Sequence, residues 1–162
     1  MDQANFLEGL IGLLDENHIR YCVIGGQGVN AYADPLVSLD LDLAVAVDQL
    51  PVVERLLSDR FRIEHFPHSL NVSTEDSQLR VQIQTDPRYF PFPERASVRE
   101  VLGLRVPVAA LEDVLIGKIW AAQDPERRAS KRRKDLLDIE RLIEAHPALR
   151  TRVPAEILAK FS

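Results

Sequence analysis

The sequence contains a single cysteine, Cys22, and no long apolar run. One cysteine excludes an intramolecular disulfide, and its apolar neighbours indicate a buried strand in which it acts as a small hydrophobic residue. No segment approaches the ~20 apolar residues of a membrane-spanning helix. Residues 1–6 show no basic stretch before an apolar run, so we expect no signal peptide. These absences favour a reducing compartment, and we expect a cytoplasmic protein without membrane contact.

Glycine and proline are too sparse for a fibrous or low-complexity chain. Apolar residues make up 46% of the sequence and charged residues 28%, which is typical of a soluble globular protein and argues against disorder. A chain of 162 residues suits one hydrophobic core. We therefore predict a single domain over residues 1–162, with a core at about 8–108 and a helical tail at about 110–162.

The formal net charge of -5 argues against a general nucleic-acid binder. The charge is nevertheless uneven, because six cations fall within one short segment: Arg127, Arg128, Lys131, Arg132, Arg133 and Lys134. Such a patch indicates either a localised anion site or partner surface, or a solvated helix start. The sequence leaves both interpretations open.

Hydrophobic periodicity predicts both helices and strands. Helices are predicted over 4–17, 27–33, about ten residues from Pro51, 111–122, 128–145 and 154–161. Strands are predicted over 19–24, 38–47, 62–66, 70–73 and 79–84, with an extended stretch near 105–108. The clearest strand is 38–47, where apolar residues alternate strictly with small or acidic ones. This order of elements predicts an α/β sandwich with a helical tail.

Asp40 and Asp42 are the central feature of the sequence. On a strand, residues two apart point to the same face, where two carboxylates repel each other unless a cation, a proton or solvent intervenes. Divalent metals such as Mg²⁺ prefer carboxylate oxygens and keep waters that phosphate oxygens can replace. The pair therefore predicts a metal–nucleotide site, with a solvated strand face as the plainer alternative.

Gly25 and Gly26 follow an apolar strand and open a short predicted helix. Without side chains, both residues let a phosphate approach the backbone amides. A simple tight turn is the alternative interpretation. The uncommon feature is the full order, in which the strand, the glycines and the helix precede Ser38-x-Asp40-x-Asp42 on a second strand.

This order resembles the nucleotidyltransferase superfamily of the polymerase-beta type, whose signature is a hydrophobic residue, Gly-Gly or Gly-Ser, a spacer and Asp-x-Asp. The downstream half is similar to the branch that contains the AbiEii-type toxins of toxin–antitoxin systems. In that branch a helix with a lysine precedes a Lys-Asp-x-x-Asp helix. The matching residues here are Lys118, then Lys134, Asp135 and Asp138, and the similarity covers about residues 8–145.

The resemblance implies an α+β fold, a nucleotidyltransferase-type mixed β-sheet flanked by helices with a C-terminal helical segment. It implies transfer of a nucleoside monophosphate from a nucleoside triphosphate to a hydroxyl of an RNA, a protein or a small molecule. By position, Asp40 and Asp42 would be the catalytic carboxylates and would hold Mg²⁺ or Mn²⁺. Nucleotide binding would fall to Gly25, Gly26, Ser38, Lys118, Lys134 and Asp135. The implied partners are the triphosphate, tRNA and a cognate toxin or antitoxin.

The lysines and aspartates of the downstream half also have plainer interpretations. Lys118 shares the apolar stripe of its predicted helix, so its ammonium must reach solvent by snorkelling or meet an anion. In the next helix, ordinary i,i+4 pairs would join Lys131 to Asp135 and Lys134 to Asp138.

Two positions depart from the family pattern. Active members usually supply a third carboxylate from a neighbouring strand, and Gln82 stands in its place, where it brings no negative charge and binds Mg²⁺ poorly. Asp86 shares the face of Gln82 but lies about 13 Å further along the strand. Leu36 stands where the family often carries an arginine. These departures favour an alternative, a catalytically decayed scaffold that acts as a binding or antitoxin partner.

Overall fold

The computed structural model describes residues 3–161, and within that range seven strands form one mixed sheet. The order across the sheet is β3-β4-β5-β2-β1-β7-β6. The strands are β1 (Tyr21–Ile24), β2 (Asp40–Val45), β3 (Arg62–Phe66), β4 (Ser69–Ser73), β5 (Arg80–Gln84), β6 (Ser97–Val101) and β7 (Leu104–Val108). β1 runs antiparallel to β2, whereas β2 with β5 and β1 with β7 are parallel pairs.

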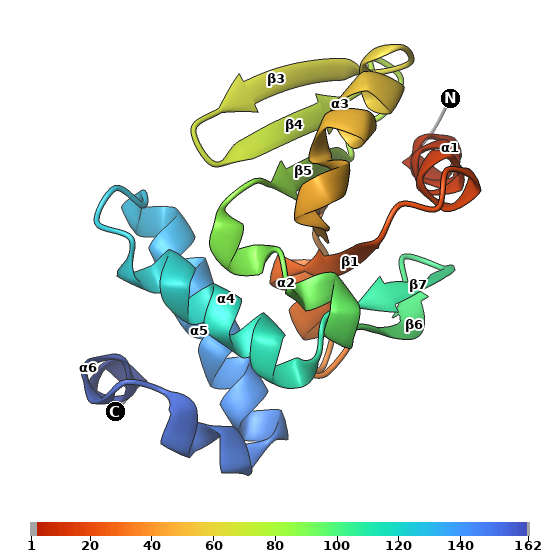
Figure 1. Cartoon of the computed structure of the whole chain (residues 1–162). Coiled ribbons are helices and arrows are strands. Elements are labelled where there is room, and N and C mark those ends of the chain that lie inside the picture. The colour runs from red at the N-terminus through yellow and green to blue at the C-terminus, as the bar shows by residue number, and fades with distance from the viewer. Residues whose placement is uncertain (1–2, 162) are drawn as a thin grey trace.

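Helices cover both faces of this sheet (Figure 1). They are α1 (Gln3–Glu16), α2 (Gly25–Asn30), α3 (Leu50–Ser58), α4 (Leu111–Gln123), α5 (Ala129–Ala145) and α6 (Ala155–Leu158). α1 and α3 pack on one face, and α4 and α5 lie side by side against the other. Among the residues that the structure describes, no helix is both long and apolar enough to cross a bilayer.

The two faces of the sheet carry separate hydrophobic cores because side chains alternate along each strand. Val23 and Leu43 are fully buried toward α1 and α3. Cys22 and Ala44 are fully buried toward α4 and α5. Each large apolar side chain removed from water contributes about 1.5–3 kcal/mol. The second core stops short of the first residues of β2, so the acidic residues there are left to face a cavity.

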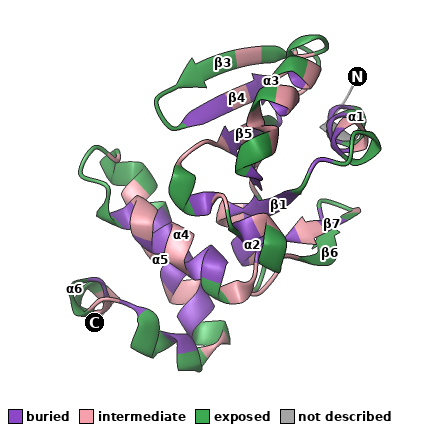
Figure 2. Ribbon diagram, in the orientation of Figure 1, coloured by how far each residue is buried: buried purple, intermediate pink, exposed green. Residues whose placement is uncertain are grey.

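The α+β fold predicted from the sequence is confirmed, with element boundaries shifted by a few residues. β6 is the one strand of the described chain that periodicity missed. Four of its five residues are exposed, so it shows no alternation, and Figure 2 shows both edge strands, β3 and β6, largely exposed. β6 is instead fixed by its hairpin with β7, where Leu102 and Gly103 take left-handed φ angles of 53° and 83°.

Candidate active site

A cavity of about 270 Å³ lies over one end of β2, β5 and β4, and the first turns of α5 form its opposite wall. Its charged lining consists of four aspartates and seven cations: Asp40, Asp42, Asp135, Asp138, Arg80, Lys118, Arg127, Arg128, Lys131, Lys134 and Arg141. Its neutral lining includes glycine, amide and aliphatic groups. The cavity therefore has an acidic floor under a cationic rim.

Most of the residues predicted from the sequence to form the site meet in this cavity. The predicted residues that line it are Asp40, Asp42, Gly26, Ser38, Lys118, Lys134 and Asp135. Gly25 does not line the cavity, but its backbone abuts Asp42. Residues from β2, α2, α4 and α5 are thus brought to one place.

Gly25 is required by the position of Asp42. Ile24 pairs with Asp42 across β1 and β2, so the chain leaves β1 directly beside that carboxylate. Gly25 takes a left-handed φ of 65°, and a Cβ added to it would stand 2.2 Å from Asp42 Oδ2. A side chain here would be strained and would also displace the carboxylate.

The two β2 carboxylates have different surroundings. Burial raises the pKa of Asp42 above its usual value, against the lowering effect of Lys118, and Asp40 raises it further. Asp42 forms no ion pair with another described residue. Asp40 accepts a hydrogen bond from Arg80 Nε at 3.1 Å, with both side chains well exposed to solvent. A bound cation would offset the cost of ionised Asp42.

The loop that leads into β2 is held by polar side chains. Asn30 Nδ2 donates to the carbonyl of Leu36 at 2.8 Å, and the Leu36 amide donates back to Asn30 Oδ1 at 3.0 Å. Gln27 Nε2 donates to the Ser38 carbonyl at 3.2 Å, and Ser38 Oγ accepts from the Asp40 amide at 3.1 Å. Side chains of α2 therefore hold the loop before β2, and with it the start of the strand that carries Asp40 and Asp42.

Arg141 ties the same loop to α5. Its Nη2 donates to Asn30 Oδ1 at 2.8 Å and to the carbonyl of Asp34. Its Nη1 donates to Asp138 at 2.8 Å. One guanidinium thus joins the loop before β2 to an acidic residue of the opposite wall.

Asp135 and Asp138 are buried and paired with cations from three places in the chain. Arg127 donates two hydrogen bonds to Asp135, at 2.8 and 3.0 Å. Lys118 Nζ lies 3.3 Å from Asp135 and 2.9 Å from Asp138. Burial by itself lowers the pKa of Lys118, but Asp138 and Asp135 outweigh it, so the pKa is raised.

These contacts contradict both plainer interpretations of the downstream residues. Lys118 does not snorkel to the surface, because its side chain is only 11% exposed and its ammonium ends on two aspartates. The expected i,i+4 pairs are not formed either, since Asp135 and Asp138 turn inward to Lys118. Lys131 and Lys134 are left exposed at the cavity rim.

The cations of the basic patch predicted at residues 127–134 have different roles. Arg127 is used by Asp135, and Arg132 donates to the carbonyls of Ala122 and Asp124 at the end of α4. Three exposed cations of the patch line the cavity and form no ion pair with another described residue: Arg128, Lys131 and Lys134. The patch is therefore partly structural and partly a cationic rim.

The position of the missing third carboxylate lies beside Asp42. Gln82 pairs with Asp42 across β5 and β2, and Asn71 pairs with Gln82 across β4 and β5. All three line the cavity. Asp86 does not substitute for the missing group, because it caps the turn at 87–89 and binds Arg88.

Sequence reasoning missed three residues of this site, Asn71, Arg127 as a partner of Asp135, and Arg141. Asn71 carries one weak signal, since it lies on the polar face of β4 between the apolar Leu70 and Val72. Arg141 contacts residues more than one hundred positions away, and no local pattern could indicate such a contact.

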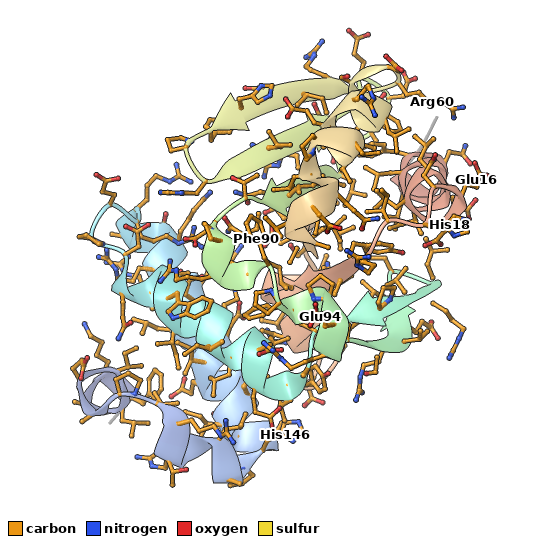
Figure 3. All side chains as sticks on the ribbon, in the orientation of Figure 1. Glu16, His18, Arg60, Phe90, Glu94 and His146 are labelled. Carbon is orange, nitrogen blue, oxygen red and sulfur yellow. The ribbon has the colours of Figure 1, made fainter. Side chains whose placement is uncertain are left out.

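Asp40 and Asp42 suit a hard divalent cation, although no larger ligand set surrounds them. In the described part of the chain, no three His, Cys, Asp or Glu side chains gather into a metal site. Mg²⁺ is commonly held by one or two carboxylates, with water and substrate phosphates as its other ligands. His18 and His146, labelled in Figure 3, lie far apart at the ends of α1 and α5, and neither lines the cavity.

Comparison with protein families gives one match. The sequence model of the family described as "Nucleotidyl transferase AbiEii toxin, Type IV TA system" matches residues 44–162. The match begins after Asp42, so the two glycines and the β2 carboxylates lie outside the matched segment. No curated protein matches the chain in sequence.

Solved structures with the same fold include an antibiotic-resistance factor and an antibiotic adenylyltransferase. The antibiotic-resistance factor ANT(2'')-Ia aligns with a TM-score of 0.59 at 15% identity, covering 93% of this chain and 92% of its own. The lincosamide antibiotic adenylyltransferase LnuA aligns with a TM-score of 0.55 at 16% identity, covering 84% and 95%. An antigenic nucleotidyltransferase-like protein from Paracoccidioides brasiliensis aligns with a TM-score of 0.55 at 18% identity, covering 86% and 74%.

Identities this low show a shared fold alone. The family match, by contrast, covers well over half of the chain, including β5, α4 and α5. The chain therefore belongs to the AbiEii nucleotidyltransferase family.

Proposed function

We propose that this protein binds a nucleoside triphosphate with Mg²⁺ or Mn²⁺ in the cavity and transfers the nucleoside monophosphate to an acceptor, releasing pyrophosphate. The observation that carries the proposal is the state of Asp40 and Asp42. They face a cavity with a cationic rim, and Asp42 has no ion-pair partner among the described residues. Family membership and the adenylyltransferase fold of LnuA support the same class of reaction.

In this proposal the floor and the rim of the cavity have separate tasks. Asp40 and Asp42 would hold the metal ion, which when bound would supply positive charge next to the α-phosphate. Gly26 and Ser38 offer backbone and hydroxyl contacts to the triphosphate, and Gly25 beside them leaves room for the Asp42 carboxylate. The reaction needs little covalent chemistry from the protein, because placement and charge neutralisation provide most of the catalysis.

The α5 wall supplies positive charge to the triphosphate. Lys134 at the rim offsets the charge of the phosphates directly. Lys118 is held by Asp135 and Asp138, close enough to Asp42 to lower its pKa. In this arrangement Asp135 positions Lys118. The Lys118 ammonium lies near Asp42 but forms its ion pairs with Asp135 and Asp138.

We also propose that the protein works within a toxin–antitoxin system, as the description of its family suggests. A cognate antitoxin protein would be its macromolecular partner. The exposed cations Arg128, Lys131 and Lys134 suit the phosphate backbone of an RNA, so tRNA is a second candidate partner.

The test is transfer of label from each of the four α-³²P-labelled ribonucleoside triphosphates, with Mg²⁺ or Mn²⁺, to components of bulk tRNA or a cell lysate. We expect labelled product from the wild-type protein and its loss in Asp40→Ala. The matched control is Asp76→Ala, because Asp76 is exposed and does not line the cavity. Equal labelling by Asp40→Ala and Asp76→Ala would contradict the proposal.

Gln82 favours a second candidate function, a nucleotidyltransferase scaffold that only binds a partner or acts as an antitoxin. A neutral amide beside Asp42 gives a metal one carboxylate ligand fewer than active relatives provide. Calorimetry distinguishes the two functions, because the enzyme binds the metal–triphosphate complex and a decayed scaffold does not. Absence of both binding and transfer would favour the scaffold.

A further inference from the structure

A row of polar side chains continues from the β2 carboxylates across two more strands. Asp42 pairs with Gln82, and Gln82 pairs with Asn71. Residues paired across neighbouring strands point to the same face of a sheet and lie about 4.7–4.9 Å apart in the direction of the hydrogen bonds. Gln82 and Asn71 both line the cavity, and we refer to these two residues as the amide ledge.

The amide ledge has unused hydrogen-bonding capacity. Asn71 Oδ1 is buried and has no hydrogen-bond partner among the described residues. A buried polar atom without a hydrogen-bond partner destabilises the folded protein. This atom has almost no accessible surface, so the Asn71 amide must turn toward the cavity before a ligand with an N–H or O–H donor can satisfy it.

The amide ledge lies on the side of Asp42 away from Gly25 and Gly26. Gly25 and Gly26 follow β1, on one side of β2, and β5 and β4 lie on the other. In phosphoryl transfer the attacking and leaving oxygens are roughly in line through the phosphorus. Pyrophosphate leaving toward the glycines therefore places the attacking oxygen over Gln82 and Asn71.

Apart from Asp40 and Asp42, which the proposed function assigns to the metal ion, no described side chain of the cavity lining is free to take a proton from an acceptor hydroxyl. An amide is not a base at physiological pH. The other carboxylates of the lining, Asp135 and Asp138, are each held by two cations. No histidine lines the cavity within the described residues. An acceptor oxygen that already carries negative charge needs no base.

The charge of the site also suits an anionic acceptor. Arg128, Lys131 and Lys134 line the cavity without an ion pair to another described residue. A carboxylate at position 82 would repel an incoming anion, whereas the amide of Gln82 does not and can donate a hydrogen bond to it.

We propose, on the basis of the function proposed above, that the acceptor is a phosphate monoester which also carries a hydroxyl group. One phosphate oxygen of the acceptor forms a bond to the α-phosphorus of the triphosphate. The bond from that phosphorus to the bridging oxygen of the β-phosphate breaks, and its electron pair leaves with pyrophosphate. No proton is transferred, and the product is a phosphoanhydride. Gln82 donates to the attacking phosphate, and Asn71 Oδ1 accepts from the acceptor's hydroxyl.

The experiment compares phosphorylated acceptors with their dephosphorylated counterparts. The wild-type protein is incubated with Mg²⁺ and α-³²P-labelled triphosphates, with a panel of sugar phosphates in one arm and a 5'-phosphorylated RNA oligonucleotide in the other. We expect labelling of a phosphorylated acceptor about tenfold or more above its counterpart, and the arm that is labelled identifies the source of the monoester. Equal labelling of a phosphorylated acceptor and its counterpart, or labelling of hydroxyl acceptors alone, would overturn the proposal.

Two variants test the amide ledge itself. Gln82→Glu keeps the size of the side chain and adds a negative charge, and we expect transfer to the phosphorylated acceptor to fall about tenfold or more while transfer to its dephosphorylated counterpart rises. Asn71→Leu removes the unpaired oxygen. Calorimetry with a non-hydrolysable triphosphate analogue already bound should show acceptor affinity about tenfold weaker, with a melting temperature equal to or above wild type.

The same measurements separate this proposal from the one on which it rests. If the triphosphate analogue binds but the label reaches only hydroxyl acceptors, the assignment of the acceptor fails and the nucleotidyltransferase function stands. If calorimetry shows no binding of the analogue with Mg²⁺ or Mn²⁺, both proposals fail together. Unchanged acceptor binding in Asn71→Leu would remove that residue from the acceptor site and contradict the role of the amide ledge.

Discussion

Two pairs of aspartates line the same cavity in opposite states. Asp135 and Asp138 on α5 are buried, and each contacts two cations. Of the β2 pair, Asp40 forms an ion pair with the exposed Arg80, and Asp42 forms none with a described residue. The first pair is committed to holding α4 against α5. In the second pair, burial makes the ionised form of Asp42 unfavourable, a cost that a bound metal ion would offset. This difference distinguishes structural carboxylates from available ones.

Among the variants of these four aspartates, we expect Asp135→Asn to lose the most folding stability. Asp135 is fully buried between Lys118 and Arg127, so its neutralisation leaves buried positive charge without compensation. We expect a loss of about 3–5 kcal/mol in the free energy of unfolding, measured by urea denaturation. The melting temperature should fall by roughly 10 °C. The exposed control Asp76→Asn should stay within about 0.5 kcal/mol of wild type. A loss below about 1 kcal/mol in Asp135→Asn would mean that the α5 pair is not structural.

Asp42→Asn should raise the stability of the folded protein, whereas Asp135→Asn should lower it. Because the pKa of Asp42 is raised in the folded protein, its ionised form is destabilising near pH 7, and removing the charge should raise the melting temperature. The same variant should weaken binding of Mg²⁺–triphosphate by about tenfold or more, because a hard cation loses a carboxylate. A melting temperature below that of wild type at pH 7 would show that Asp42 is a structural residue.

The gain from Asp42→Asn should depend on pH with a defined sign. Above the raised pKa, wild-type Asp42 is ionised in the folded state and bears the full cost. As the pH falls below that raised pKa, the folded protein takes up the proton before the unfolded chain does, so the cost shrinks, and it is gone below the ordinary pKa of an aspartate. The difference in stability between variant and wild type should therefore be largest near neutral pH and shrink on acidification. Thermal melts over a pH series measure it.

The smallest expected change in stability belongs to Asp40→Asn. Its ion pair with Arg80 is solvent-exposed on both sides, and such pairs contribute about 0–1 kcal/mol. We expect the free energy of unfolding to change by less than about 0.5 kcal/mol, while the affinity for Mg²⁺–triphosphate drops. Urea denaturation and calorimetry on the same sample separate the two effects. Unchanged affinity would remove Asp40 from the metal site.

The sequence predicted the fold and much of the cavity because the signals were local. Strict alternation predicted a strand at 38–47, with Asp40 and Asp42 on one face, and helical spacing predicted α4 and α5. β6 escaped because an exposed edge strand has no buried face to impose alternation.

The partners of the charged residues could not be predicted in this way. Local spacing favoured Lys131 and Lys134 as partners of Asp135 and Asp138, because residues four apart on a helix are neighbours. The tertiary fold instead places Lys118 of another helix between the two aspartates. A buried ammonium outcompetes exposed ones, because ion pairs are stronger away from solvent.

The close approach of Gly25 to Asp42 links the histories of the two positions. With this backbone, a lineage cannot acquire a side chain at position 25 while an aspartate keeps its place at position 42, since the two would occupy the same volume. In homologues that have lost the aspartate at position 42, the steric clash no longer applies and only the positive φ still favours glycine at position 25. Both positions can then be substituted. An aligned set of homologues should therefore show paired replacement at 25 and 42, and the glycine records that room for the carboxylate has been kept.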